Sequence, residues 1–202
     1  MIARTLSFSR WLIGTALLAT LPSTVAISQE LTDEPDKTMA AAQQSFIKKD
    51  TKTATEHLQK SAAYVRKEAD KVAKSSQAGL KKAGDQLAQL GKDVTKGAVK
   101  SADDMAKVFA KVDYERAKAW HATAAQAKKS GKDATDGLKQ AGAALNGAAQ
   151  WSGAQLKQGT TMAVESVKKI GQGAKLGAEE TEKMFKSLGE GVEDLGRHLA
   201  RP

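Results

Sequence analysis

The chain has 202 residues, a formal net charge of +9, no cysteine and only 4% aromatic residues. The lack of cysteine excludes disulfides, thiolate metal sites and an N-terminal lipidated cysteine. Acidic residues are interspersed with the basic ones, so no concentrated basic arm is present and no nucleic-acid partner is expected.

The composition favours an all-α fold with a thin core. Proline occurs only at Pro22, Pro35 and Pro202, and the abundant alanine and lysine are strong helix formers. Alanine dominates the 41% of hydrophobic residues and buries little area. Each of the 17 glycines costs roughly 1 kcal/mol relative to alanine inside a helix. We therefore expect long amphipathic helices that are marginally stable or partly disordered.

The N-terminal residues 1–26 have the layout of a secretory signal peptide. Arg4 and Arg10 precede a short apolar stretch that breaks at Pro22, and small residues precede a cleavage site placed after Ala26. The apolar stretch is shorter than the roughly 20 residues of a spanning helix, which argues against a membrane anchor. The mature protein is expected in the periplasm or the extracellular space.

An acidic linker is expected at 27–35, followed by a helical hairpin at 36–76. Asp33 can cap the first helix and Pro35 suits a first helical turn. Basic residues near position 48 and a capping group at Asp50 or Thr51 mark the turn between the two helices.

The remaining region, 77–202, reads as a long amphipathic helical segment rich in alanine, lysine and glycine. From Leu58 to Leu199 one apolar or small position recurs about every 3.6 residues, the α-helical period. Two residues correspond to about 200° of helical rotation, so nine lysines that follow this stripe by two positions are expected on the opposite face. They are Lys60, Lys67, Lys71, Lys74, Lys92, Lys96, Lys100, Lys107 and Lys111.

One straight helix over this span would be more than about 200 Å long, so the chain is expected to fold back as an antiparallel bundle or hairpin. Breaks are expected near 91, near 131 and at 171–177, where glycines lie beside polar residues or cluster together. The number of helices is expected to be three to five.

No catalytic, cofactor or metal motif is recognised, so the chain is predicted to be no enzyme and to hold no cofactor. The three histidines are far apart and read as surface or rim residues, and the adjacent acid pairs point in different directions on a helix. The possible interaction surface comprises Trp120, Trp151, Phe109 and Phe185. Of these, Trp120 lies on the stripe and is most simply a core residue, whereas Trp151 lies off the stripe and is either exposed or faces a partner.

Segments such as Ala83-Gly84-Asp85-Gln86 and 94–102, with their approximate eleven-residue spacing, resemble group 3 late embryogenesis abundant proteins over roughly 58–180. That resemblance implies a weakly folded chain that becomes helical on drying or on membranes and shields proteins or bilayers. The leucine, phenylalanine and tryptophan of the stripe depart from the family and suggest a more settled fold. The same region resembles the lipid-surface helices of apolipoproteins and synucleins.

Two functions follow as expectations. The first is an exported, non-enzymatic, stress-protective helical protein. The alternative is a helical-bundle binding or scaffold module that contacts another protein or itself. Weak association with anionic membranes ranks below protein or self-association, because the lysines lie opposite the apolar stripe and do not flank it.

Overall fold

The computed structural model describes residues 33–171 and 177–201 of the chain. The predicted signal peptide and most of the acidic linker lie outside the described residues, as does most of the predicted break at 171–177. Within them the chain is all-α, as predicted, with seven helices in place of the expected three to five. They are α1 (Glu34–Ile47), α2 (Thr51–Ala69), α3 (Lys74–Thr95), α4 (Ala102–Lys129), α5 (Thr135–Ser152), α6 (Gln158–Gly171) and α7 (Ala178–Leu199).

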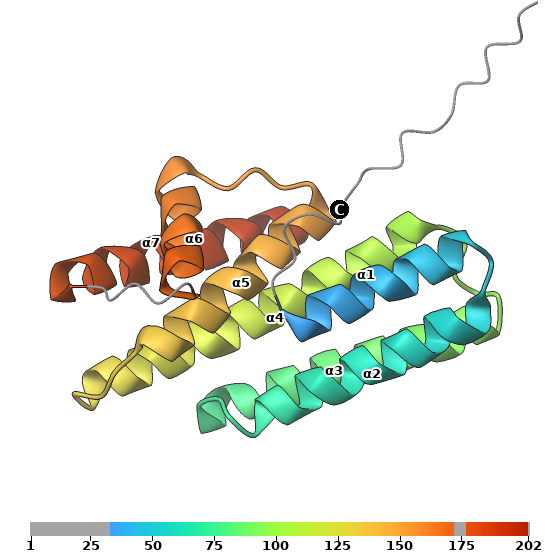
Figure 1. Cartoon of the computed structure of the whole chain (residues 1–202), viewed down its shortest axis with the longest axis horizontal. Helices are drawn as coiled ribbons and strands as arrows, with labels where there is room; N and C mark the ends of the chain where they lie inside the picture. The colour runs from blue at the N-terminus through green and yellow to red at the C-terminus, as the bar shows by residue number, and fades with distance from the viewer. Residues whose placement is uncertain (1–32, 172–176, 202) are drawn as a thin grey trace, which may run out of the picture.

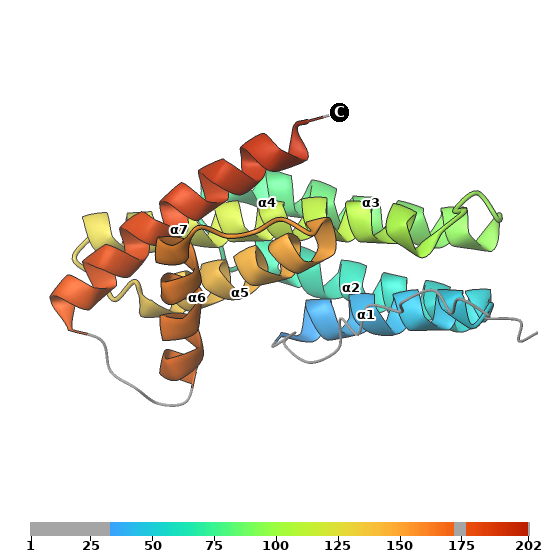
Figure 2. The same cartoon turned by 90° about the horizontal axis from the view of Figure 1, so that it is seen from above.

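The seven helices form two bundles that share the long helix α4. Helices α1 to α4 run up and down, and α1 and α3 both contact α4, which closes a four-helix bundle (Figure 1). On its other side α4 pairs with α5, and α6 and α7 complete a second group, with α7 contacting both α4 and α5 (Figure 2). Helix α4 is therefore the element around which the fold is arranged.

Local sequence explains where the first two helices begin. The Asp33 side chain accepts a hydrogen bond from the Asp36 N–H at 3.0 Å and caps α1, and Pro35 stands in its first turn. Asp50 caps α2 in the same way through the Thr53 N–H. Helix α1 thus starts at Glu34, two residues before the predicted hairpin, so residues 33–35 belong to the helix and its cap.

The apolar stripe faces the core along most of its length. Its members from Leu58 to Val94 are buried apart from the half-buried Ser76, and the stripe is exposed at Ala98, Gly131 and Ala178, between helices or at a helix end. All nine lysines predicted on the opposite face are exposed. Of the 36 buried hydrophobic residues among those described, 15 are alanine, so the core is thin for its length.

The predicted break at Gly91 is wrong, because Gly91 is buried inside α3. A Cβ there would lie 3.5 Å from Thr55 Cγ2 and 3.6 Å from Leu58 Cβ, so this glycine packs against α2. Helix α3 instead ends at Thr95 and the chain turns at Gly97, whose φ is +67°. The chain does turn at Gly131, where φ is +64°. The predicted hairpin ended at 76, but α2 ends at Ala69 and α3 already begins at Lys74. The turn at 153–157 was not predicted.

None of the helices in the described ranges is long and apolar enough to cross a membrane.

Candidate functional site

The most unusual group in the described structure is Arg116, a fully buried arginine on α4. Charged side chains are almost never fully buried unless they are paired. A buried guanidinium therefore needs partners for all five of its N–H donors.

Four carboxyl groups supply one acceptor oxygen for each of these five donors. The Nε and Nη2 groups of Arg116 donate to Oε2 and Oε1 of Glu68, both at 2.9 Å. Its Nη1 group donates to Asp113 Oδ1 at 2.8 Å and to Asp36 Oδ1 at 3.3 Å, and Nη2 also donates to Asp33 Oδ2 at 2.5 Å. Every donor of Arg116 is used, and we call these five residues the Arg116 cluster.

Three helices bring the cluster together. Asp33 and Asp36 come from the cap and first turn of α1, Glu68 comes from the last turn of α2, and Asp113 precedes Arg116 by one turn of α4. Asp33 has two roles, since one of its oxygens caps α1 and the other binds Arg116. The cluster therefore fixes the start of α1 and the end of α2 against the middle of α4.

Asp36 and Asp113 form a pair of buried carboxyl groups beside α5. Their oxygens face the same point of α5, since a Cβ at Gly147 would lie 2.6 Å from Asp113 Oδ2 and 2.8 Å from Asp36 Oδ2. Two ionised carboxyl groups this close to each other repel. The repulsion favours protonation of one of them, which raises its pKa. Only a residue without a side chain fits at position 147, so the second bundle covers the pair directly.

Burial raises the pKa values of both carboxyl groups of this pair. Loss of hydration raises the pKa of Asp36 well above its usual value, and the charges of Asp113 and Asp33 raise it further, against the opposing effect of Arg116. Loss of hydration also raises the pKa of Asp113 to about 6, although Arg116 favours its ionised form. Burial is thus the first cause of the raised pKa of both carboxyl groups.

Asp33 and Arg116 show the opposite balance. Burial raises the pKa of Asp33, but the charge and hydrogen bond of Arg116 and the Asp36 N–H outweigh it and leave that pKa lowered. Burial lowers the pKa of Arg116, but Asp33, Glu68 and Asp113 outweigh it and raise that pKa. Four carboxyl groups thus surround a single guanidinium.

The cluster positions helices and offers no free donor to a substrate. Its central position is occupied by the guanidinium, and no group of three or more metal-binding side chains in the described ranges is arranged to hold a metal ion. A buried ion pair of this kind favours one specific arrangement of elements over others.

No family model, curated protein or solved structure matches the chain. The site is therefore interpreted from its own geometry.

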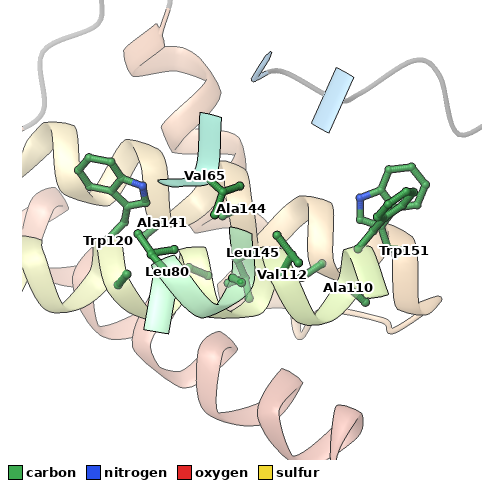
Figure 3. Packing of buried hydrophobic residues seen from close by; sticks show 14 of the residues in the cluster. Val65, Leu80, Ala110, Val112, Trp120, Ala141, Ala144, Leu145 and Trp151 are labelled. Atoms are coloured by element: carbon green, nitrogen blue, oxygen red, sulfur yellow. The ribbon is translucent and has the colours of Figure 1, made fainter. Parts of the chain in front are cut away.

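The four residues predicted as an interaction surface lie in or against the core. Phe109 and Trp151 are buried with their rings edge to face, 5.0 Å between centroids, and Trp120 is buried farther along α4 (Figure 3). Phe185 is half-buried and stacked on His121 at 4.4 Å, with Lys128 over its ring. Trp151 lies off the stripe because it faces Phe109 of the neighbouring helix. These side chains therefore do not form an exposed contact surface on the folded chain.

The sequence carries one local indication of the cluster, which neither its composition nor its apolar periodicity shows. Asp113 and Arg116 are three residues apart and each lies next to a stripe position, Val112 and Ala117 respectively. An acid and an arginine at this spacing can pair on one helix, and here both lie beside the apolar stripe. Their partners on α1 and α2 are 48 to 83 residues away in sequence and have no local signature.

His121 is the histidine most involved in packing. Its Nε2 lies 3.1 Å from the Phe185 carbonyl oxygen, and it is half-buried between α4 and α7. His57 is half-buried and His198 is exposed.

Proposed function

We propose that this chain is an exported, non-enzymatic helical scaffold that folds on its own and acts by binding another protein or a second copy of itself. The observation that carries the proposal is the Arg116 cluster, in which one guanidinium satisfies all its donors with side chains from three helices. Removing one partner of a buried pair leaves an uncompensated charge, which costs several kcal/mol. Such a cluster favours a cooperative, predefined fold.

This interpretation differs from that of a chain that folds only on drying. A conditionally folded protein stays open in water because it buries too little apolar surface to offset the entropy of ordering. Here the Arg116 cluster fixes the orientation of α1, α2 and α4 around a thin core. The close approach of Gly147 to Asp36 and Asp113 adds a second contact, between α5 and the cluster. Both support a settled bundle whose outer surface is available for binding.

Stress protection is the second candidate, and the composition of the core supports it. Helices α4 and α5 bury several alanines, including Ala117, Ala124, Ala141 and Ala144, and each of these buries little area. Marginal helices of this type would gain stability when water is withdrawn.

Circular dichroism in dilute buffer distinguishes the two functions. The scaffold predicts a helical spectrum, a cooperative thermal transition and a lower midpoint of that transition in Arg116→Met. Weak helicity that rises on drying, with no cooperative transition in buffer, contradicts the scaffold and supports protection. Analytical ultracentrifugation of the same samples then tests self-association.

Export is tested separately. Expression of the full chain in a double-membrane bacterium, fractionation and N-terminal sequencing should recover a periplasmic or secreted form that begins at Ile27. Retention of an uncleaved chain in the cytoplasm contradicts the export part of the proposal.

A further inference from the structure

The positive charge of the chain is concentrated in one hairpin. Residues 48–100, which comprise α2, α3 and their flanking turns, contain 13 basic and six acidic residues. The chain from Ser101 onward contains 16 basic and 13 acidic residues over nearly twice the length. In Figure 1 the α2–α3 hairpin lies on the side of the molecule away from α6 and α7.

The basic residues of the hairpin are all exposed, and few are neutralised. Arg66 is paired with Asp85 at 2.7 Å, whereas none of the 12 lysines forms an ion pair within the described part of the chain. Among the six acids, Glu68 binds the buried Arg116 and does not offset surface charge. The outer surface of the hairpin therefore carries a larger positive excess than the sequence count indicates.

Seven of the 12 lysines lie on α2 and α3, and the other five lie in the flanking turns. On α2 the buried residues include Leu58 and Val65, and Lys60 and Lys67 follow each of them by two positions on the opposite side. On α3 the buried Leu80 and Leu87 face inward in the same way, and Lys82 lies opposite Leu80. The charge is thus distributed along both helices and their turns, and we call the 12 lysines and Arg66 the lysine band.

The chemistry of this band fits a broad anionic surface better than a protein partner. Protein interfaces are enriched in aromatic residues and arginine and depleted in lysine. The band is built of lysine, and its one arginine is committed to Asp85. Lysine acts as a hydrated point charge without directional pairing, which suits a sheet of phosphate headgroups.

We propose that the outward face of the α2–α3 hairpin docks on the surface of an anionic lipid bilayer. The only exposed large hydrophobic side chains among the described residues are Ile47 and Met162, and neither lies on α2 or α3. Docking is therefore electrostatic and superficial, and the folded bundle stays outside the hydrocarbon region. This property goes beyond the proposed scaffold function and does not depend on the identity of its protein partner.

Co-sedimentation of the chain from residue 27 onward with vesicles tests the docking. Vesicles of phosphatidylcholine with phosphatidylglycerol should bind the protein at low salt, and added salt should release it, because the contact is screened. Vesicles of phosphatidylcholine alone should not bind it. Changing Lys67, Lys74, Lys81 and Lys82 together to glutamine should weaken binding by about tenfold or more.

The matched control changes Lys129, Lys132, Lys169 and Lys186 to glutamine, which removes the same net charge outside the hairpin. These four side chains are exposed, so both variants should keep the wild-type circular dichroism spectrum. A second hairpin variant with arginine at the same four positions should keep binding. Equal loss in both glutamine variants, binding that resists salt, or no binding to anionic vesicles at low salt overturns the proposal. Tighter binding to duplex DNA than to vesicles at one ionic strength overturns it in favour of a nucleic-acid partner.

Discussion

Glu68 and Arg116 join α2 to α4 through two parallel hydrogen bonds, each 2.9 Å long, between residues 48 positions apart. Two-pronged pairing of this kind sets orientation as well as distance, because the planar guanidinium matches the planar carboxylate. Glu68 lies at the end of α2, where a negative charge is unfavourable to the helix dipole. Its position is therefore explained by Arg116 and not by local helix preferences.

Changing Arg116 to methionine should be strongly destabilising. The substitution keeps an unbranched apolar stem but leaves Asp36 and Asp113 buried without their cation. The free energy of unfolding, measured by urea titration at neutral pH, should fall by about 3–5 kcal/mol.

Arg66→Met provides the control for this change. Arg66 pairs with Asp85 on the surface, where the two side chains are 45% and 69% exposed. Exposed pairs contribute little, so the stability should change by no more than about 1 kcal/mol. If both variants lose the same amount of stability, the Arg116 cluster does not hold the fold together.

The cluster should make the protein more stable at mildly acidic than at neutral pH. The pKa of Asp113 is raised to about 6, so between its unfolded and folded pKa values the folded chain binds more protons than the unfolded chain. The free energy of unfolding should then fall as the pH rises through this range, by up to about 3 kcal/mol. Asp36, whose pKa is also raised, acts in the same direction. Asp33, whose pKa is lowered, acts oppositely and loses its contribution only as the pH falls below its usual value.

Urea titrations across this range, repeated with Asp113→Asn, check the assignment. The amide keeps an oxygen for Arg116 and has nearly the shape of the carboxyl group, but it does not titrate. The variant should therefore show a flatter dependence of stability on pH. An unchanged slope would assign the dependence to other groups.

Gly147→Ala tests the contact between α5 and the carboxyl pair. The new methyl group would lie 2.6 Å from Asp113 Oδ2, closer than van der Waals contact allows, so helix or carboxylate must shift. We expect a loss of about 1–3 kcal/mol in unfolding free energy. Gly159→Ala in α6 is the control, since its methyl group would meet only Ser187 Oγ at 3.7 Å. That change should be neutral or stabilising by up to about 1 kcal/mol.

The helical class and the buried face were predictable from the sequence because they depend on local periodicity. Leu58, Val65 and Leu87 recur at helical spacing, and the structure buries all three. The number of helices was not predictable, because a small residue can mark either a turn or a close contact. Gly91 and Gly97 look alike in sequence, and only the position of α2 beside Gly91 distinguishes them.

The Arg116 cluster was not predictable for a different reason. Asp33 and Asp36 read as a linker acid and a helix-start acid, which are sufficient local explanations. Their additional role depends on a contact with α4 some 80 residues later, as the Arg116–Asp36 hydrogen bond shows. A charged residue whose position is explained by the start of a helix can therefore also pair with a residue distant in sequence.

The position of the turn between α3 and α4 can be tested with two alanine substitutions. Gly91 lies in the helix interior and its Cβ would make ordinary contacts at 3.5–3.8 Å, so Gly91→Ala should be neutral or stabilise the fold by up to about 1 kcal/mol through helix propensity. Gly97 has a φ of +67°, where alanine is strained, so Gly97→Ala should destabilise by about 1 kcal/mol. Thermal unfolding of both variants under one set of conditions measures the difference. A chain that breaks at Gly91 would reverse the order, because the strained glycine would then be Gly91 and Gly97 would tolerate alanine.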